Sequence, residues 1–245
     1  MGHLRAAGKL ARALLHIATG FLTILLVFPR VPQAERQARI QAWSARMLQC
    51  IGIELRVSGN AATQGPLLLV ANHISWLDIT ALHAARFCRF VSKADIKAWP
   101  VIGTLAVGVG TLFIERESRR DAMRVVHLMT ERLREGDVIG VFPEGTTSDG
   151  VGLLPFHANL LQAAISAEVP VQPVAIQFLD KTNGQRSPAP CYIDDDTLLG
   201  SVWRTLRATG IVVVITFGEP QLASGRDRRE WAHALRDDVG ALRQA

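Results

Sequence analysis

The stretch GPLLLVANHISWLDITALHAA, residues 65–85, passes from an apolar run through a short polar loop into a helical pattern. The apolar run is typical of a strand buried on both faces of a sheet, and the segment from residue 76 onward predicts a helix. Asn72, His73 and Asp78 lie at this junction. Three interpretations fit them: a catalytic pair, part of a metal site, or a buried polar trio that only satisfies itself.

The same alternation continues along the chain. Apolar runs predict strands at residues 53–59, 88–93, 111–116, 137–146 (running into a loop), 169–178 and 211–220. Helical patterns occupy residues 76–87, 95–110, 121–136, 160–168, 196–210 and 225–244, with Asp196 as an expected N-cap. Strands alternating with helices predict an α/β fold with a mostly parallel, helix-covered sheet over residues 52–245. The polar residues 181–190 are expected to form a surface loop.

Residues 1–51 are expected to form a separate, membrane-associated helical hairpin. Residues 13–28 are apolar and carry no formal charge, but these sixteen residues fall short of the ~20 that span a bilayer upright. A proline-containing turn follows, and then an amphipathic helix with Ile40, Trp43 and Met47 on one face. Basic residues on both flanks favour a hairpin in the cytoplasmic leaflet. The alternatives are a true span, a cleaved signal peptide or a soluble core helix.

The positive charge is concentrated near the N-terminus. Residues 1–56 hold eight Lys or Arg and two acidic residues, whereas the remaining 189 residues hold 19 basic and 20 acidic side chains. A segment that is both basic and apolar indicates an anionic membrane surface as a partner, and the neutral body argues against nucleic acid. The three cysteines, Cys50, Cys88 and Cys191, form no CxxC pair, which fits a reducing compartment.

Three polar clusters follow predicted strands: Asn72 with His73, Glu115 with Arg116, and residues 144–147. Because the carboxyl ends of parallel strands gather at one rim, these clusters predict one site. A histidine there suits a general base, and a carboxylate on its other ring nitrogen would fix the tautomer and stabilise the imidazolium. The alternative is that His73 and Asp78 cap the following helix and do no more.

The order and spacing of these clusters resemble the glycerolipid acyltransferase family, in particular its 1-acyl-sn-glycerol-3-phosphate acyltransferases of the bacterial lysophospholipid type. The family's first block, an Asn-His followed by Asp after four residues, matches Asn72, His73 and Asp78. GTLFIER, ending at Arg116, matches the second block, FPEGT at residues 142–146 the third, and VPVQPVAI at residues 169–176 the fourth. An isolated HxxxxD is a weak signal, but four blocks in order over about residues 52–220 are specific.

The resemblance implies a role for each matching residue. His73 would be the general base, oriented by Asp78, and the acceptor hydroxyl would be the nucleophile, so that no covalent enzyme intermediate forms. Arg116 would bind the acceptor's phosphate, because a guanidinium can bind it in bidentate fashion. The alternative for Arg116 is a surface ion pair with a neighbouring glutamate. The other implied substrate-binding residues are Asn72, Phe142, Pro143, Glu144, Gly145 and Thr146.

One departure from the family pattern concerns the acceptor. After the third block, family members usually carry a basic residue followed by a small one, whereas this chain reads LPFHANLLQAA with His157 and Asn159. His157 would take the place of the basic phosphate ligand, and it would carry a positive charge for a phosphate only when protonated. This weaker charge brings a lyso-ornithine lipid, which has no phosphate, into consideration beside lysophosphatidic acid.

We therefore predict an enzyme of phospholipid biosynthesis at the cytoplasmic face of the inner membrane. It would transfer an acyl group from acyl-CoA or acyl carrier protein to the sn-2 hydroxyl of lysophosphatidic acid, giving phosphatidic acid, with no cofactor and no metal. The first alternative is a lyso-ornithine lipid (or other lysolipid) acyltransferase. A lipid hydrolase would need a GxSxG elbow, which the sequence lacks. A non-catalytic membrane adaptor would leave the polar rim unexplained.

Residues 98–110 are apolar and rich in glycine, and two alternative roles are open for them. They would either line a groove for a fatty chain or pack as an ordinary helix.

Overall fold

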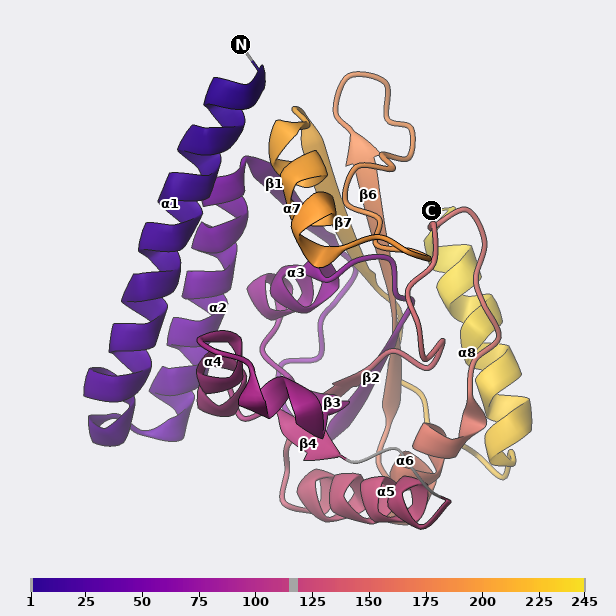
Figure 1. Cartoon of the computed structure of the whole chain (residues 1–245). Coiled ribbons are helices and arrows are strands. Elements are labelled where there is room, and N and C mark those ends of the chain that lie inside the picture. Colours follow the sequence, from indigo (N-terminus) through magenta and orange to yellow (C-terminus); the bar gives the residue numbers. More distant parts are fainter. Residues whose placement is uncertain (1, 115–118, 245) are drawn as a thin grey trace.

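The computed structural model describes residues 2–114 and 119–244, and its centre is a seven-stranded sheet (Figure 1). The strands are β1 (Ile53–Ser58), β2 (Leu67–Ala71), β3 (Arg89–Lys93), β4 (Leu112–Ile114), β5 (Val138–Val141), β6 (Val171–Asp180) and β7 (Ile211–Phe217). Their order is β1-β7-β6-β2-β5-β3-β4. All neighbours are parallel except β6 and β7, so β1 and β7 run opposite to the other five strands. The predicted helix-covered, mostly parallel sheet is confirmed.

The helices follow the predicted alternation closely. The chain begins with α1 (Gly2–Leu22), which continues through the short turns η1 (Thr23–Val27) and η2 (Phe28–Arg30) into α2 (Gln33–Ile51). The remaining elements are α3 (Leu77–Ala85), η3 (Ala94–Ala98), α4 (Ile102–Gly108), α5 (Arg119–Arg134), η4 (Ala158–Leu160), α6 (Leu161–Ala167), α7 (Leu198–Arg207) and α8 (Arg228–Leu242).

The β2 strand is apolar throughout because helices cover both of its faces. Its alternate residues Leu67, Leu69 and Ala71 belong to a core shared with α2 and α3, whereas Leu68 and Val70 belong to a core shared with α5, α6 and α8. Side chains alternate across a strand, so a strand between two helical layers must be apolar at every position. The first of these cores also continues into the N-terminal helices, across the expected boundary at residue 52.

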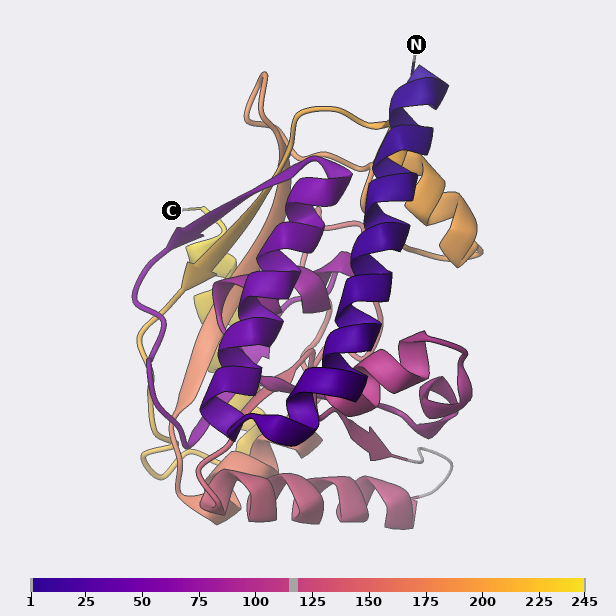
Figure 2. The ribbon, with the colours of Figure 1, turned by 90° about the vertical axis from the view of Figure 1, so that its left-hand side faces the viewer.

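The two N-terminal helices lie side by side and are docked on the sheet domain (Figure 2). Trp43 Nε1–H donates to the His16 carbonyl at 3.1 Å, and the two rings stack with centroids 4.9 Å apart. Gly20 makes room for this indole, since a Cβ there would lie 2.6 Å from Trp43 Nε1. Lys9 Nζ donates to the Ala208 carbonyl at 2.7 Å and so links α1 to the end of α7.

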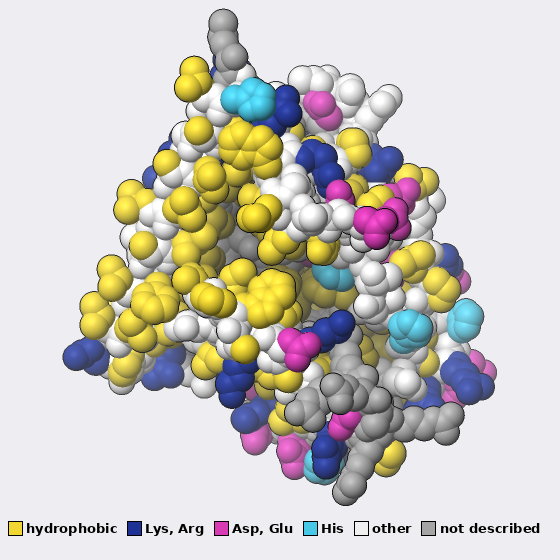
Figure 3. All heavy atoms as spheres, in the orientation of Figure 1, with side chains coloured by type: hydrophobic (Ala, Val, Ile, Leu, Met, Phe, Trp, Pro, Cys, Tyr) yellow, Lys and Arg dark blue, Asp and Glu magenta, His cyan; other side chains and the backbone are white. Residues whose placement is uncertain are grey.

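The outer side of α1 is apolar and open to the surroundings. Residues 2–30 are long and apolar enough to cross a bilayer. Their most apolar window has a mean hydropathy of 1.9, and 11% of that window is buried. Figure 3 shows apolar side chains gathered over α1 on this face of the molecule. The exposed leucines are Leu4, Leu14, Leu15, Leu22, Leu25 and Leu26.

Two local predictions were wrong. The single helix expected over residues 95–110 is divided into η3 and α4, because Pro100 has no N–H and holds Trp99 in an extended conformation (ψ 130°). The N-cap of α7 is Thr197, whose side chain accepts from Gly200 N, and not Asp196, which pairs with Arg204 instead.

Within α3, His83 is buried and uncharged at neutral pH. Its Nε2 lies 2.8 Å from the Cys88 carbonyl, and a carbonyl can only accept, so Nε2 carries the proton. Burial lowers the pKa of His83 to about 4, although this hydrogen bond opposes the shift. The folded-state pKa is therefore below the unfolded value, and the stability that His83 contributes at neutral pH is lost as the pH falls from about 6.5 toward 4.

We expect His83→Gln to weaken this acid sensitivity, because a glutamine amide can keep the bond to Cys88 and does not titrate. The free energy of unfolding of the wild type should fall by about 3 kcal/mol more than that of the variant between these two pH values. Urea unfolding in mild detergent across this range measures the difference. His233→Gln, the same change at an exposed position of α8, is the control and should keep the wild-type slope. Equal slopes for wild type and His83→Gln would contradict the assignment.

Candidate active site

Two loops meet at the carboxyl edge of the sheet because β2 and β5 are parallel neighbours, with Val70 opposite Val141. The first loop begins with Asn72 and the second with Phe142. They are bonded to each other: Ser148 N and Oγ both donate to the His73 carbonyl, at 2.9 and 3.1 Å. The sheet therefore brings the first and third sequence blocks together, as the rim argument predicted.

The Asp78 carboxylate folds back onto the loop that precedes α3. His73 Nδ1 lies 2.7 Å from Asp78 Oδ2, and the same oxygen accepts from Ile74 N at 2.6 Å and Ser75 N at 2.9 Å. Asp78 is fully buried in the first turn of α3, where the helix dipole favours a negative charge. Its other oxygen, Oδ1, has no hydrogen-bond partner among the described residues. The carboxylate thus holds the loop that precedes α3 and orients the imidazole, although the N-cap side chain of α3 itself makes no capping hydrogen bond.

The His73 ring is fixed on two sides and open on a third. It stacks on Phe142 with centroids 4.1 Å apart and planes 7° apart, and Phe142 stacks in turn on Phe90 of β3 at 5.4 Å. The side chain of His73 is 20% exposed, and no described residue hydrogen-bonds to its Nε2. With Nδ1–H donating to the carboxylate, Nε2 carries a free lone pair that faces the accessible side.

Glu144 connects the two loops through its buried carboxylate. His73 N donates to Oε1 at 2.8 Å, and Leu154 N donates to Oε2 at 3.0 Å. Burial raises the pKa of Glu144, and these two backbone hydrogen bonds oppose that shift. Each oxygen has a second lone pair, so Glu144 can hold the loops and still accept from a bound hydroxyl.

Asn72 and Ser75 are bonded within the protein. The Asn72 amide donates to the Ile176 carbonyl at 3.0 Å and accepts from Ile176 N at 2.8 Å, which continues the contact of β2 with β6. Ser75 Oγ is buried and donates to the Pro190 carbonyl at 2.5 Å, while accepting from Leu77 N. These contacts give both side chains a positioning role, and substrate contact by Asn72 stays a prediction.

His157, the residue that departs from the family pattern, lies beside the FPEGT loop. Its backbone N donates to the Pro143 carbonyl at 2.8 Å, and its ring packs against Gly145, where a Cβ would be 3.1 Å from His157 Cδ2. Gly145 has φ +73°, a conformation that glycine adopts without strain. Thr146 is exposed in the same loop. Arg116, the expected phosphate ligand, lies outside the described residues.

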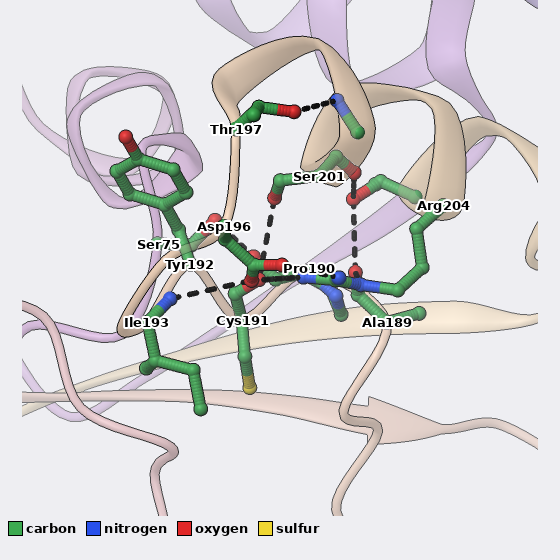
Figure 4. A network of polar contacts seen from close by, with 12 residues as sticks. Ser75, Ala189, Pro190, Cys191, Tyr192, Ile193, Asp196, Thr197, Ser201 and Arg204 are labelled. Atoms are coloured by element: carbon green, nitrogen blue, oxygen red, sulfur yellow. Dashed lines mark hydrogen bonds and ion pairs between the residues drawn. The ribbon is translucent and has the colours of Figure 1, made fainter.

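Residues 189–192, which the sequence did not single out, brace the loop that carries His73 and Ser75 (Figure 4). Besides the Pro190 contact, Tyr192 N donates to the Ile74 carbonyl at 3.1 Å, and the Thr147 hydroxyl donates to the Tyr192 carbonyl. The expected surface loop is thus exposed over residues 181–186, but Ser187 and Pro190 near its end are buried. In the sequence, only the prolines and the apolar residues at 188–191 could have indicated that this segment is buried. They do not indicate that it contacts the loop at Ser75.

Arg204 of α7 holds that segment in place. Its guanidinium pairs with Asp196 at 2.7 Å and donates to the carbonyls of Ala189 and Cys191 (Figure 4). The hydrogen bond from Arg204 lowers the pKa of Asp196 to about 2, so the pair stays ionised across the physiological range.

The described residues contain no group of three or more His, Cys, Asp or Glu side chains that could hold a metal ion. The groups that the described part of the site brings together are the imidazoles of His73 and His157, the carboxylates of Asp78 and Glu144, and backbone N–H groups.

The fold is shared with a solved acyltransferase. The crystal structure of a 1-acyl-sn-glycerophosphate (LPA) acyltransferase from Thermotoga maritima matches 98% of this chain and 94% of its own with a TM-score of 0.70. The two sequences are 18% identical, so this likeness shows the fold alone.

Sequence relatives cover most of the chain. The family described as Acyltransferase matches residues 52–177. A lyso-ornithine lipid O-acyltransferase of Pseudomonas aeruginosa is 38% identical over 98% of this chain and 93% of its own length. A 1-acyl-sn-glycerol-3-phosphate acyltransferase of Neisseria gonorrhoeae is 38% identical over 77% of this chain and 72% of its own. From these matches and the shared fold it follows that the chain belongs to the lysophospholipid acyltransferase family.

Proposed function

We propose that this acyltransferase esterifies the sn-2 hydroxyl of lysophosphatidic acid with an acyl group from acyl-CoA or acyl carrier protein. The observation that carries the proposal is the His73–Asp78 pair, 2.7 Å apart, with Nε2 of the imidazole open to a substrate. The stack of His73 on Phe142 and the bonds to its backbone N and carbonyl hold this nitrogen in one place.

The proposed reaction needs one proton carrier and no covalent enzyme intermediate. His73 Nε2 takes the proton of the acceptor hydroxyl while the hydroxyl oxygen attacks the thioester carbonyl. The buried Asp78 carboxylate stabilises the imidazolium that forms. When the tetrahedral intermediate collapses, the carbon–sulfur bond breaks, and the imidazolium returns its proton to the departing thiolate. The products are the ester and the free thiol.

The observations on the site and its relatives favour two different acceptors. The FPEGT loop and the proposed phosphate ligand Arg116 support a phosphate-bearing acceptor. His157 beside Gly145 offers less positive charge than the basic residue of the family pattern, and a lyso-ornithine lipid acyltransferase matches nearly the whole chain. Acylation of a lyso-ornithine lipid is therefore the second candidate function.

The described N-terminal helices support attachment to one leaflet. The relatives and the apolar helix indicate association with a membrane. In the structure α1 packs along α2 and α7 and is joined to Ala208 through Lys9, contacts that an upright span would break. We propose that the hairpin lies in the cytoplasmic leaflet of the inner membrane, with its exposed leucines among the acyl chains. A periplasmic reporter signal from a topology fusion would overturn this placement.

Asp78→Asn should separate orientation of His73 from stabilisation of its charge. The amide oxygen can keep the three hydrogen bonds of Oδ2, and the NH₂ group takes the position of Oδ1, which has no partner among the described residues. We expect kcat to fall roughly 10³-fold because the negative charge beside the imidazolium is lost. Thermal unfolding should change little. Steady-state rates in lipid nanodiscs and a melting curve test this, and wild-type kcat in the variant would contradict the role of Asp78.

A side-by-side assay of the two lysolipids tests which acceptor the enzyme uses. Purified full-length protein in nanodiscs receives radiolabelled acyl-CoA with lysophosphatidic acid or lyso-ornithine lipid, and His73→Ala serves as the inactive control. We expect phosphatidic acid to form faster than acylated ornithine lipid. His157→Lys should lower KM for lysophosphatidic acid several-fold through the added charge and leave the other acceptor unaffected. Acylation of the ornithine lipid alone would establish the second candidate, and full activity of His73→Ala would exclude both.

A further inference from the structure

The segment formed by η3 and α4, residues 94–108, exposes a cluster of large apolar side chains. Trp99, Val101, Ile102 and Val107 are between 44% and 51% exposed. Single apolar residues on a surface need no explanation, but four within nine positions form a patch of the kind that marks an interaction site.

The backbone of this segment is strained at Val101, in the middle of the patch. Val101 has φ +64°, which a β-branched residue rarely adopts, and its side chain gains no burial in return. The turn is closed by backbone bonds from Ile102 N to Pro100 O at 2.7 Å and from Gly103 N to Trp99 O at 2.9 Å. Only glycine fits at 103, since a Cβ would lie 2.2 Å from the Lys97 carbonyl oxygen.

This patch is continuous with the apolar side of the N-terminal helix. Ile24 of η1 packs on Gly108 of α4 so closely that a Cβ at residue 108 would lie 2.4 Å from Ile24 Cδ1. Leu25 and Leu26 next to Ile24 are half exposed or more. Figure 2 places α1 and α4 on the same side of the molecule, and Figure 3 shows apolar side chains over both helices.

Basic residues lie next to the apolar patch. Lys93 and Lys97 are exposed at the start of the segment, and Arg30 is exposed at the end of η2. Trp99 stands between the lysines and the aliphatic residues in sequence. Tryptophan and basic side chains flanking an aliphatic patch are the features by which proteins bind the boundary of an anionic bilayer.

We propose that residues 94–108 are a second membrane-inserting element, which enters the same anionic leaflet as the N-terminal hairpin. Trp99 lies at the head-group boundary, and Val101, Ile102 and Val107 contact the acyl chains. The inference rests on the proposed action at a membrane and adds a surface to it. Because η3 directly follows β3, whose Phe90 stacks on Phe142, the inserted element adjoins the FPEGT loop. A lysolipid can then reach His73 without leaving the leaflet.

Depth-dependent quenching tests the insertion directly. An environment-sensitive NBD probe is attached at Ile102→Cys in a Cys50→Ser background, because Cys88 and Cys191 are buried. The full-length protein is bound to vesicles of phosphatidylglycerol and phosphatidylethanolamine with brominated acyl chains. We expect a blue shift and quenching at residue 102. The same probe at Val151→Cys, an exposed position near the end of α8, should show neither. An unquenched probe at residue 102 would overturn the proposal. A blue shift that appears only as the protein concentration rises would also overturn it, because it would indicate contact between protein molecules.

A kinetic comparison shows whether the insertion serves catalysis. Ile102→Asp should reduce the preference for vesicle-borne lysolipid over a short-chain monomeric one several-fold, and Val151→Asp should retain it. An unchanged preference in Ile102→Asp would contradict the delivery role. If the wild type acylates neither lysolipid, the proposed function fails, while the quenching experiment still decides insertion by itself.

Discussion

One buried oxygen, Oδ2 of Asp78, fixes the geometry on which the site depends. It accepts from the His73 ring and from two consecutive backbone N–H groups, so the loop, the first turn of α3 and the imidazole share a single centre. A buried carboxylate is tolerated only when hydrogen bonds and local dipoles compensate its desolvation. Stability and the orientation of His73 therefore depend on the same contacts here, while Asp78 Oδ1 has no partner among the described residues and Nε2 of His73 stays open.

The sheet extends this constraint to the second loop. Parallel pairing of β2 and β5 brings residue 144 beside residue 73, and the Glu144 carboxylate and Ser148 then fix the backbone of His73 on both sides. The segment at residues 189–192, held by Arg204, accepts a hydrogen bond from Ser75 and so supports the loop that carries His73. The catalytic histidine of the proposal is thus positioned by Asp78 and by three distant parts of the chain, namely the loop at residues 142–148, residues 189–192 and Arg204. The proposed acceptor site is bounded by the loops that carry His73 and Glu144.

The apolar surface over α1 and the η3–α4 segment indicates how the site is placed relative to a membrane. The exposed side of α1 and the strained tip of η3–α4 lie on one side of the molecule, and the contact of Ile24 with Gly108 joins them. A site built at the edge of a sheet and flanked by such a surface suits substrates that are themselves anchored in a leaflet. The proposed reaction and the proposed surface agree in this respect, although they rest on different residues.

The sequence by itself determined the alternation of strands and helices, the rim at which the first and third polar clusters meet and the pairing of His73 with Asp78. These features depend on local patterns: apolar runs, helical periodicity and a spacing of five residues. Tertiary structure alone decided that β1 and β7 run against the other strands, that Ser187, Pro190 and Cys191 are buried and that Asp196 binds Arg204. The helix expected at residues 95–110 is divided by Pro100, a local signal that the sequence already carried. The other features needed tertiary structure because strand direction, burial and ion pairing are set by partners that no local pattern specifies.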